Sequence, residues 1–393
     1  MQIAQAVFGV FHHFELAREL EKRGHLQRVY STWPWRRLQR EGIAQDKVAT
    51  FPWLHTAQYL AGRAPVDLRW LTKPIDQQIA PTFDHWQLRQ FRSQLSRKQP
   101  LPDALISISG ASHHSGIWLQ EHGGRFICDR GSSHHRYQME IVSEEFARWK
   151  VPGEPVDIRN VVREEEIYRV ADAITVPSSF AARSFIEMGV PAEKVHRIPY
   201  GVRLERFQSG PIQSEGEFNV LFAGQVGIRK GVPYLLQAFK NLPFKKKTLR
   251  IVGAVQPEIK NLLGSFQTEN VEFLGSLPQD ELIGLMQRSH LLVLPSIEEG
   301  LALVQAQALA CGCPILCSTN TGGEDLITDG VEGYVVPVRD VQAMTERMER
   351  LAGDRELWLK MREAALLRVQ HLGGWSSYGD QWETLLRTLT GKQ

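Results

Sequence analysis

The sequence predicts an α/β protein with two doubly wound domains, each built around a parallel sheet. The chain has 393 residues, which is too long for one ordinary hydrophobic core and indicates two domains. Short apolar runs alternate with longer amphipathic stretches along the chain, which is the pattern of repeated βα units. The segment F-Q-S-G-P-I-Q-S-E-G-E-F (207–218) is rich in Gly, Ser and Gln and predicts a linker between the domains.

Nine apolar runs are candidate strands, and in doubly wound domains a ligand binds beyond their carboxyl ends. They are residues 3–8, 104–109, 125–129, 173–177, 219–223, 249–253, 271–275, 291–295 and 314–318. Helical patterns such as F-E-L-A-R-E-L-E-K-R-G separate them, and Gly24 suits the position after that helix. Patterning is weakest between residues 30 and 100, where W-P-W-R-R and several prolines predict an irregular or helical insertion.

Composition excludes several classes of protein. Apolar and charged residues make up 42% and 23% of the chain, as in soluble globular proteins, and a net charge of +2 does not favour nucleic acid. The sequence shows no signal-peptide pattern and no apolar run of membrane-spanning length, so we expect a cytoplasmic protein. The four cysteines do not resemble a disulfide framework, and C-G-C-P-I-L-C lacks a nearby fourth metal ligand.

The stretch G-Q-V-G-I-R-K-G (224–231) follows the apolar run N-V-L-F-A and precedes a helical pattern. Backbone N–H groups at such a helix start favour an anion, and glycine permits close approach. Arg229 can bind a phosphate through two donors, and Lys230 adds a point charge. The spacing fits neither a Walker A loop nor a dinucleotide fingerprint. The residues alone predict either a phosphate site or a tight, solvated turn.

The second informative stretch is P-S-I-E-E-G-L-A-L-V-Q-A-Q-A-L-A-C-G-C-P-I-L-C-S (295–318). Glu299 opens a helix beside the expected cleft, where a carboxylate can bind hydroxyl groups. The alternative is that Glu299 only caps the helix, which would stabilise it by about 1 kcal/mol or less. Gln307 lies about two turns later and therefore on nearly the same helix face.

Together these stretches resemble the nucleotide-sugar domain of the retaining glycosyltransferase family 4, which has the GT-B fold. The family pattern is a G-x-x-x-x-x-K-G loop followed by E-G-[FL]-x-x-x-x-x-E-A-x-A-x-G-x-P-[VI]. T-G-G-E-D-L-I-T-D-G-V-E-G-Y-V-V (321–336) and S-S-F-A-A-R-S-F-I-E-M-G-V-P-A-E-K-V-H-R-I-P-Y-G-V (178–202) resemble further parts of it. The resemblance is good over residues 165 to 340 and looser before them.

The resemblance implies two Rossmann-like domains that face a central cleft. An acceptor-binding domain would span residues 1–206, a nucleotide-sugar domain residues 207–375, and a last helix at 376–391 would pack back on the first. The implied activity moves a sugar from a nucleotide-diphosphate sugar to an acceptor hydroxyl, with retention, in polysaccharide or glycolipid synthesis. A GT-B-type nucleotide-sugar epimerase and a non-catalytic nucleotide-sugar-binding protein stay open as alternatives.

The resemblance also implies roles for individual residues. Glu299 would bind the donor sugar and take part in catalysis, with Gly300 and Leu301 beside it. Gln307 stands where the family has a glutamate for the ribose, and Gln225 where it often has arginine. Because Gln307 is uncharged, it cannot form the charge-assisted hydrogen bond that a glutamate would form with the ribose, and the binding free energy would be weaker by about 1–2 kcal/mol. The implied residues for the donor diphosphate are Arg229, Lys230, Gly9 and Gly224.

The N-terminal half carries fewer matching residues. The family's double glycine after the first strand is reduced to Gly9, followed by F-H-H, so His12 and His13 line the cleft or lie on the surface. A histidine just beyond a strand contacts the donor sugar in the family. His134 is the first candidate for that role, ahead of His113, and Asp129 is another contender.

Two further expectations concern metals and membranes. D-x-D is absent, so Arg229 and Lys230 would replace a metal, and no cofactor is expected. Residues 1 to 100 hold 15 Lys and Arg against 8 Asp and Glu. W-P-W-R-R-L-Q-R predicts either peripheral membrane contact or a half-buried helix with a basic face. The residues concerned are Trp33, Trp35, Arg36, Arg37 and Arg40.

Overall fold

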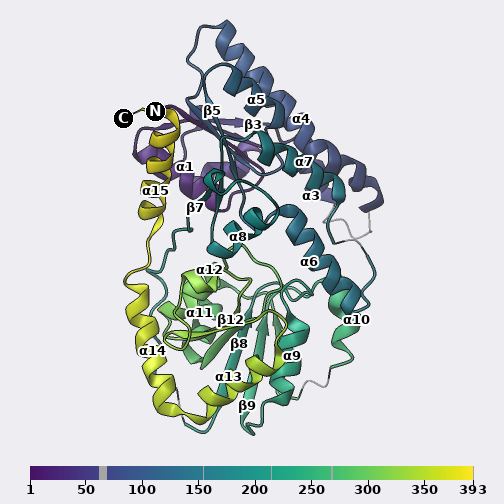
Figure 1. Cartoon of the computed structure of the whole chain (residues 1–393), viewed down its shortest axis with the longest axis vertical. Coiled ribbons are helices and arrows are strands. Elements are labelled where there is room, and N and C mark those ends of the chain that lie inside the picture. Colours follow the sequence, from purple (N-terminus) through teal and green to yellow (C-terminus); the bar gives the residue numbers. More distant parts are fainter. Residues whose placement is uncertain (62–68, 154, 214, 267–268, 393) are drawn as a thin grey trace.

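The chain forms two α/β domains, which lie one above the other in Figure 1. The computed structural model describes residues 1–61, 69–153, 155–213, 215–266 and 269–392. Each domain holds one sheet, and all neighbouring strands in both sheets run parallel. Parallel strands need crossover connections, and the helices between them supply these. The predicted doubly wound fold class is therefore confirmed.

The sheet of the N-terminal domain has the strand order β3-β2-β1-β4-β5-β6-β7. The order reverses between β1 and β4, which opens a crevice at the carboxyl ends of these strands. The strands are β1 (Ile3–Val7), β2 (Leu26–Ser31), β3 (Val48–Thr50), β4 (Ala104–Ile108), β5 (Arg125–Asp129), β6 (Ala173–Val176) and β7 (Val195–Arg197). The main crossover helices are α1 (His12–Lys22), α5 (His113–Glu121), α6 (His135–Arg148), α7 (Ile158–Val170) and α8 (Ser179–Glu187).

The predicted insertion between residues 30 and 100 is mostly helical. It holds α2 (Trp35–Leu38), the 3-10 turns η1 (Gln39–Glu41) and η2 (Gln45–Lys47), α3 (Trp53–Ala61) and α4 (Arg69–Ser96). The edge strand β3 within it and the adjacent β2 were not predicted from the sequence. β3 has only three residues, none fully buried, so it leaves no apolar run to detect. A third short turn, η3 (Ala192–Lys194), precedes β7.

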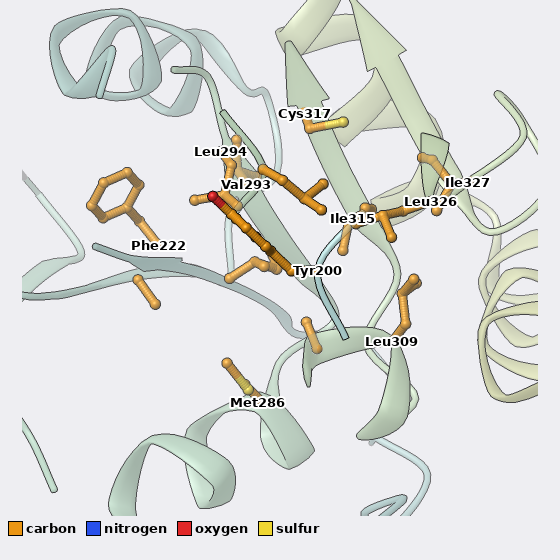
Figure 2. Packing of buried hydrophobic residues seen from close by; sticks show 14 of the residues in the cluster. Tyr200, Phe222, Met286, Val293, Leu294, Leu309, Ile315, Cys317, Leu326 and Ile327 are labelled. Atoms are coloured by element: carbon orange, nitrogen blue, oxygen red, sulfur yellow. The ribbon is translucent and has the colours of Figure 1, made fainter. Parts of the chain in front are cut away.

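The sheet of the C-terminal domain has the order β10-β9-β8-β11-β12-β13. Its strands are β8 (Phe218–Ala223), β9 (Lys247–Val252), β10 (Val271–Gly275), β11 (Leu291–Leu294), β12 (Ile315–Ser318) and β13 (Gly333–Val336). Its helices are α9 (Val232–Asn241), η4 (Pro257–Ile259), α10 (Lys260–Leu263), α11 (Gln279–Arg288), α12 (Leu303–Ala310), η5 (Gly323–Asp325), α13 (Val341–Gly353) and α14 (Arg355–Val369). Figure 2 shows part of the core, with Phe222, Val293 and Ile315 from the sheet and Met286 and Leu309 from the helices.

The last helix, α15 (Trp375–Thr390), leaves the C-terminal domain and lies beside α1 of the N-terminal domain (Figure 1). Arg23, just after α1, pairs with Asp380 at 2.6 Å and with Glu383 at 3.2 Å. Trp382 is fully buried in this contact region. Among the helices described, none is long and apolar enough to span a bilayer.

Candidate active site

The loop 224–231 connects β8 to α9 and packs tightly against the loop that follows β11. Gly231 has the left-handed φ of +67°, and a Cβ there would lie 1.9 Å from the carbonyl oxygen of Pro295. The N–H of Ile297 donates to the carbonyl oxygen of Arg229 at 2.8 Å. The glycine at position 231 is therefore required by sterics, and the loop presents its Arg-Lys pair at the N-terminal end of α9.

Both cations of this pair contact carboxylates from the neighbouring loop. Lys230 forms an ion pair with Glu299, and Nη1 of Arg229 lies 3.2 Å from the carboxylate of Glu298. Burial and the adjacent Arg229 lower the pKa of Lys230, whereas Glu298 raises it. The contact with Glu299 also favours the charged ammonium. The structure thus brings together three residues singled out from the sequence, Arg229, Lys230 and Glu299.

The remaining residues predicted for the C-terminal domain lie around this pair. A Cβ on Gly300 would lie 2.1 Å from the carbonyl oxygen of Gly131, so the two domains touch at this glycine. Leu301 is buried and lines a separate interdomain cavity of about 230 Å³. Gln307 is half-buried on α12, while Gln225 is exposed. Gly224 makes another close approach, because a Cβ on Gly253 would lie 1.8 Å from its carbonyl oxygen.

Arg229 lines a cleft of about 810 Å³ between the domains. Pro257 and Glu258 contribute from the C-terminal domain, and His135, Gln138 and Asn160 from the N-terminal domain. A second cavity, of about 280 Å³, lies in the N-terminal domain and shares His135 and Asn160 with the first. The two cavities therefore share part of their wall and lie next to each other, and together they provide room for a nucleotide and a second ligand.

The carboxylate of Asp129, at the end of β5, is buried beside two histidines from the start of α1. Nε2 of His12 lies 2.9 Å and Nε2 of His13 lies 3.3 Å from Oδ2, and Thr175 donates to Oδ1 at 2.8 Å. Burial lowers the pKa of His12 to about 4. Burial alone would raise the pKa of Asp129, but the two imidazoles hold it well below its ordinary value. His12 and His13 are thus buried, unlike the surface histidines that the sequence also allowed.

This trio is the only group of three potential metal ligands in the described parts of the chain. Metal-bound histidines usually donate their other ring N–H to an acceptor. Nδ1 of His12 is buried without a hydrogen-bond partner. The short contact between His12 and Asp129 fits a direct hydrogen bond, and we assign no metal to it.

His134 lies away from the cleft. It is the N-cap of α6, where Nδ1 accepts from the N–H of Arg136 at 3.2 Å. Its ring packs against Tyr168 and Phe185. Burial lowers the pKa of His134 to about 4, and Glu165 opposes the shift. The structure brings the next residue, His135, to the cleft instead, because the helix begins there and turns the side chain to another face.

The other candidates of the N-terminal domain occupy three different places. Gly9 has open space around it at the turn after β1. His113 begins α5 and lines a small surface cavity, and burial lowers its pKa. Trp33 and Trp35 are half-buried against the core, with Arg37 4.1 Å above the Trp33 ring.

A buried polar network behind the cleft was missed by sequence analysis. Arg130 binds Glu164 at 3.0 Å and Oε1 of Gln138 at 2.7 Å, and Nδ1 of His135 lies 2.8 Å from Glu164. Glu164 also accepts from Tyr168 at 2.6 Å. The density of polar residues in D-R-G-S-S-H-H-R-Y-Q hinted at such a cluster, but Glu164 is too distant in sequence to be linked to it.

Comparisons with known proteins bear on this site. The sequence model described as "Glycosyl transferases group 1" matches residues 205–368, and that described as "Glycosyl transferase 4-like domain" matches residues 12–201. Alpha-D-kanosaminyltransferase of Streptomyces kanamyceticus is 25% identical over 288 residues, which cover 69% of this chain and 70% of that protein. D-inositol 3-phosphate glycosyltransferase of Xylanimonas cellulosilytica is 24% identical over 264 residues, 61% of this chain and 63% of that protein.

Solved structures show the same fold over the whole chain. Sucrose-phosphate synthase from Thermosynechococcus elongatus superposes with a TM-score of 0.68 at 19% identity, covering 100% of both chains. Alr3699/HepE of Anabaena in complex with UDP-glucose superposes with a TM-score of 0.67 at 16% identity, covering 99% of this chain and 100% of that one. These matches do not favour the epimerase or the non-catalytic binding protein. The chain belongs to the family-4-type glycosyltransferases of the GT-B fold.

Proposed function

We propose that this glycosyltransferase moves a sugar from a nucleotide-diphosphate sugar to an acceptor hydroxyl and retains the anomeric configuration. The observation that carries the proposal is the cluster of Arg229, Lys230 and Glu299 at the start of α9 and beside the interdomain cleft. Two cations at a helix N-terminus suit a diphosphate, and a carboxylate beside them suits sugar hydroxyls. The similarity to Alr3699/HepE, whose structures hold UDP or UDP-glucose, supports this class of donor.

In the proposed reaction the donor diphosphate binds Arg229, Lys230 and the first N–H groups of α9. The bond between the anomeric carbon and the phosphate oxygen breaks, and its electron pair leaves with the nucleoside diphosphate. Arg229 and Lys230 stabilise the charge that develops there, so the step needs no metal. The acceptor oxygen bonds to the same face of the sugar, and its proton passes to the leaving phosphate oxygen. Glu299 orients the sugar and Gln307 holds the ribose. Asp129 is a further candidate for contact with the donor sugar, whereas His134 caps α6 away from the cleft.

We place the acceptor in the cavity of about 280 Å³ in the N-terminal domain. It adjoins the donor cleft at His135 and Asn160, which line both cavities, and Gln58 and Ser109 also line it. Most of these side chains donate or accept hydrogen bonds, which suits a hydroxylated ligand such as a glycan or the head group of a glycolipid. An acceptor there would lie close to the sugar of a donor bound at Arg229, as the transfer requires.

Peripheral membrane contact is part of the proposal, at the cytoplasmic face where polysaccharide and glycolipid precursors are assembled. Arg36 and Arg40 are exposed, and Trp53 is 74% exposed. Two other residues of α3, His55 and Tyr59, pack against Trp33, so the tryptophan and the arginines lie in one region of the domain. Sedimentation with vesicles of anionic and of neutral lipid tests this, and R36E/R40E should release the protein from the anionic vesicles only.

The activity is tested by incubating the protein with a panel of UDP-, GDP- and ADP-sugars in EDTA and following nucleoside diphosphate release by mass spectrometry. We expect slow release from one donor, reduced at least about 100-fold in Arg229→Ala and Glu299→Ala. Lys360 and Glu356 form an exposed ion pair on α14, so Lys360→Ala and Glu356→Ala are matched controls for lost charge. Release that requires added metal, or that persists in both active-site variants, contradicts the proposal.

A further inference from the structure

Glu298, the residue before Glu299, is a fully buried carboxylate that contacts two residues lining the cleft, Arg229 and Gln138. Burial of an ionised carboxylate is strongly unfavourable unless donors satisfy both oxygens. Here Oε1 accepts from the hydroxyls of Ser132 and Ser133 and from the N–H of Ser133, the last two at 2.8 and 3.2 Å. Oε2 accepts from Gln138 at 2.8 Å and from Arg229 at 3.2 Å. Every acceptor direction of this carboxylate is therefore used.

The donors come from opposite sides of the cleft. Ser132 and Ser133 lie in the turn between β5 and α6, and Gln138 lies on α6, all in the N-terminal domain. Arg229 lies in the C-terminal domain and also donates to the backbone carbonyl of Glu298 at 2.9 Å. The same carboxylate thus holds the arginine and binds the opposite domain. Burial alone would raise the pKa of Glu298, but Arg229 and the two hydroxyls hold it below its ordinary value.

Arg229 is only partly enclosed by these contacts. Its side chain remains 32% exposed and lines the cleft, while Nη1 donates to both the backbone carbonyl oxygen and the carboxylate of Glu298. A guanidinium fixed at one nitrogen keeps further donors for a diphosphate in a defined orientation. Without Glu298 it would adopt many rotamers, and ordering them on binding would lower affinity.

We propose that Glu298 is a positioning residue that couples the N-terminal domain to donor binding. When Ser132, Ser133 and Gln138 hold its carboxylate, Glu298 fixes the Arg229 guanidinium in the orientation that binds the diphosphate. The N-terminal domain thereby strengthens nucleotide affinity without contacting the diphosphate itself. The inference rests on the proposed function, because that assigns the diphosphate to Arg229. It adds that domain closure and donor affinity are linked through one carboxylate.

The test measures nucleoside diphosphate affinity by calorimetry for the wild type, S132A/S133A, Arg229→Ala and the triple variant. We expect S132A/S133A to weaken affinity about five- to twentyfold, and to have no further effect once Arg229 is replaced. Ser184→Ala is the matched control, because Ser184 is another buried hydroxyl of the N-terminal domain and does not contact Glu298. A purely structural role of the serines would lower the melting temperature and leave affinity unchanged.

The outcomes separate this inference from the proposed function. If the wild type binds UDP, GDP or ADP and S132A/S133A binds it equally well, Glu298 does not couple the domains and the inference alone is overturned. An equal loss of affinity in the Arg229→Ala background also overturns it, since the effect would then not pass through Arg229. If the wild type binds none of the three nucleotides, the proposed function falls, and the inference falls with it.

Discussion

The imidazole of His12 lies 2.9 Å from the carboxylate of Asp129, although 117 positions separate them in the sequence. β1 and β5 both flank β4, so the turns that follow them meet at one edge of the sheet. The ring of Tyr200 packs against His12 with centroids 4.5 Å apart and shields the pair from solvent. Asp129 therefore stabilises the turn that carries Gly9 and the start of α1, whatever part it plays in catalysis.

Replacement of this carboxylate should destabilise the protein. Asp129→Ala leaves two buried imidazoles and the hydroxyl of Thr175 without their acceptor, and we expect a loss of about 3 kcal/mol in the free energy of unfolding. Asp129→Asn keeps one acceptor oxygen and should lose about half as much. Urea denaturation measures both. Asp380→Ala removes an exposed partner of Arg23 and should cost less than about 1 kcal/mol; a similar loss in all three variants would contradict the assignment.

Acid should destabilise the protein through its buried histidines. The pKa of His12 and that of His134 both fall from 6.5 to about 4 on folding, so the unfolded chain binds more protons between these values. The contribution of these two neutral histidines to the free energy of unfolding is therefore fully present above about pH 6.5. It is lost as the pH falls towards 4, by up to about 1.4 kcal/mol per pH unit for each group. His134→Asn keeps a capping acceptor for α6 without the titration. Its urea midpoint should fall less steeply between pH 7.5 and 5, and an unchanged slope would refute this account of His134.

Gly231→Ala should disrupt the diphosphate loop. Both its left-handed φ and the 1.9 Å approach of a Cβ to Pro295 oppose the substitution. Gly275 has the same φ of +67° but nothing within 4 Å of its Cβ position, so Gly275→Ala carries the backbone strain alone, about 1 kcal/mol. We expect Gly231→Ala to lower the free energy of unfolding by at least about 2 kcal/mol more than Gly275→Ala does, and to abolish nucleotide binding. Equal unfolding midpoints for the two variants would show that the loop adapts to the side chain.

Gln307→Glu should strengthen nucleotide binding. A carboxylate accepts charge-assisted hydrogen bonds from ribose hydroxyls that are worth about 1–2 kcal/mol more than those to an amide, so affinity should rise about tenfold. Inorganic pyrophosphate has no ribose, and its affinity should not rise. Calorimetry with both ligands distinguishes the cases. Tighter binding of pyrophosphate, or no change for the nucleotide, would place Gln307 outside the ribose site.

Most strands that could be predicted from the sequence are short runs in which apolar residues predominate. β8 is expected at 219–223 and found at Phe218–Ala223, and β5 is found as expected at 125–129. β7 and β13 have three and four residues, and pairing with β6 and β12 makes them strands. Neither strand was predicted from the sequence.

The fold class, the family, the Arg229-Lys230 pair and Glu299 could each be predicted from the sequence, because each depends on residues close together in the chain. The contact between Lys230 and Glu299 was decided by tertiary structure, since the two residues lie in different loops. Hydrophobic alternation defines βα units locally, and the turn after a strand carries its own glycines and charges. Tertiary structure alone decided which polar groups meet across the sheet and across the cleft. It placed Glu298 against Ser132, Ser133 and Gln138, at least 160 positions away, and it put His135 rather than His134 at the cleft. These choices depend on strand order and on the closure of two domains, which no local pattern encodes.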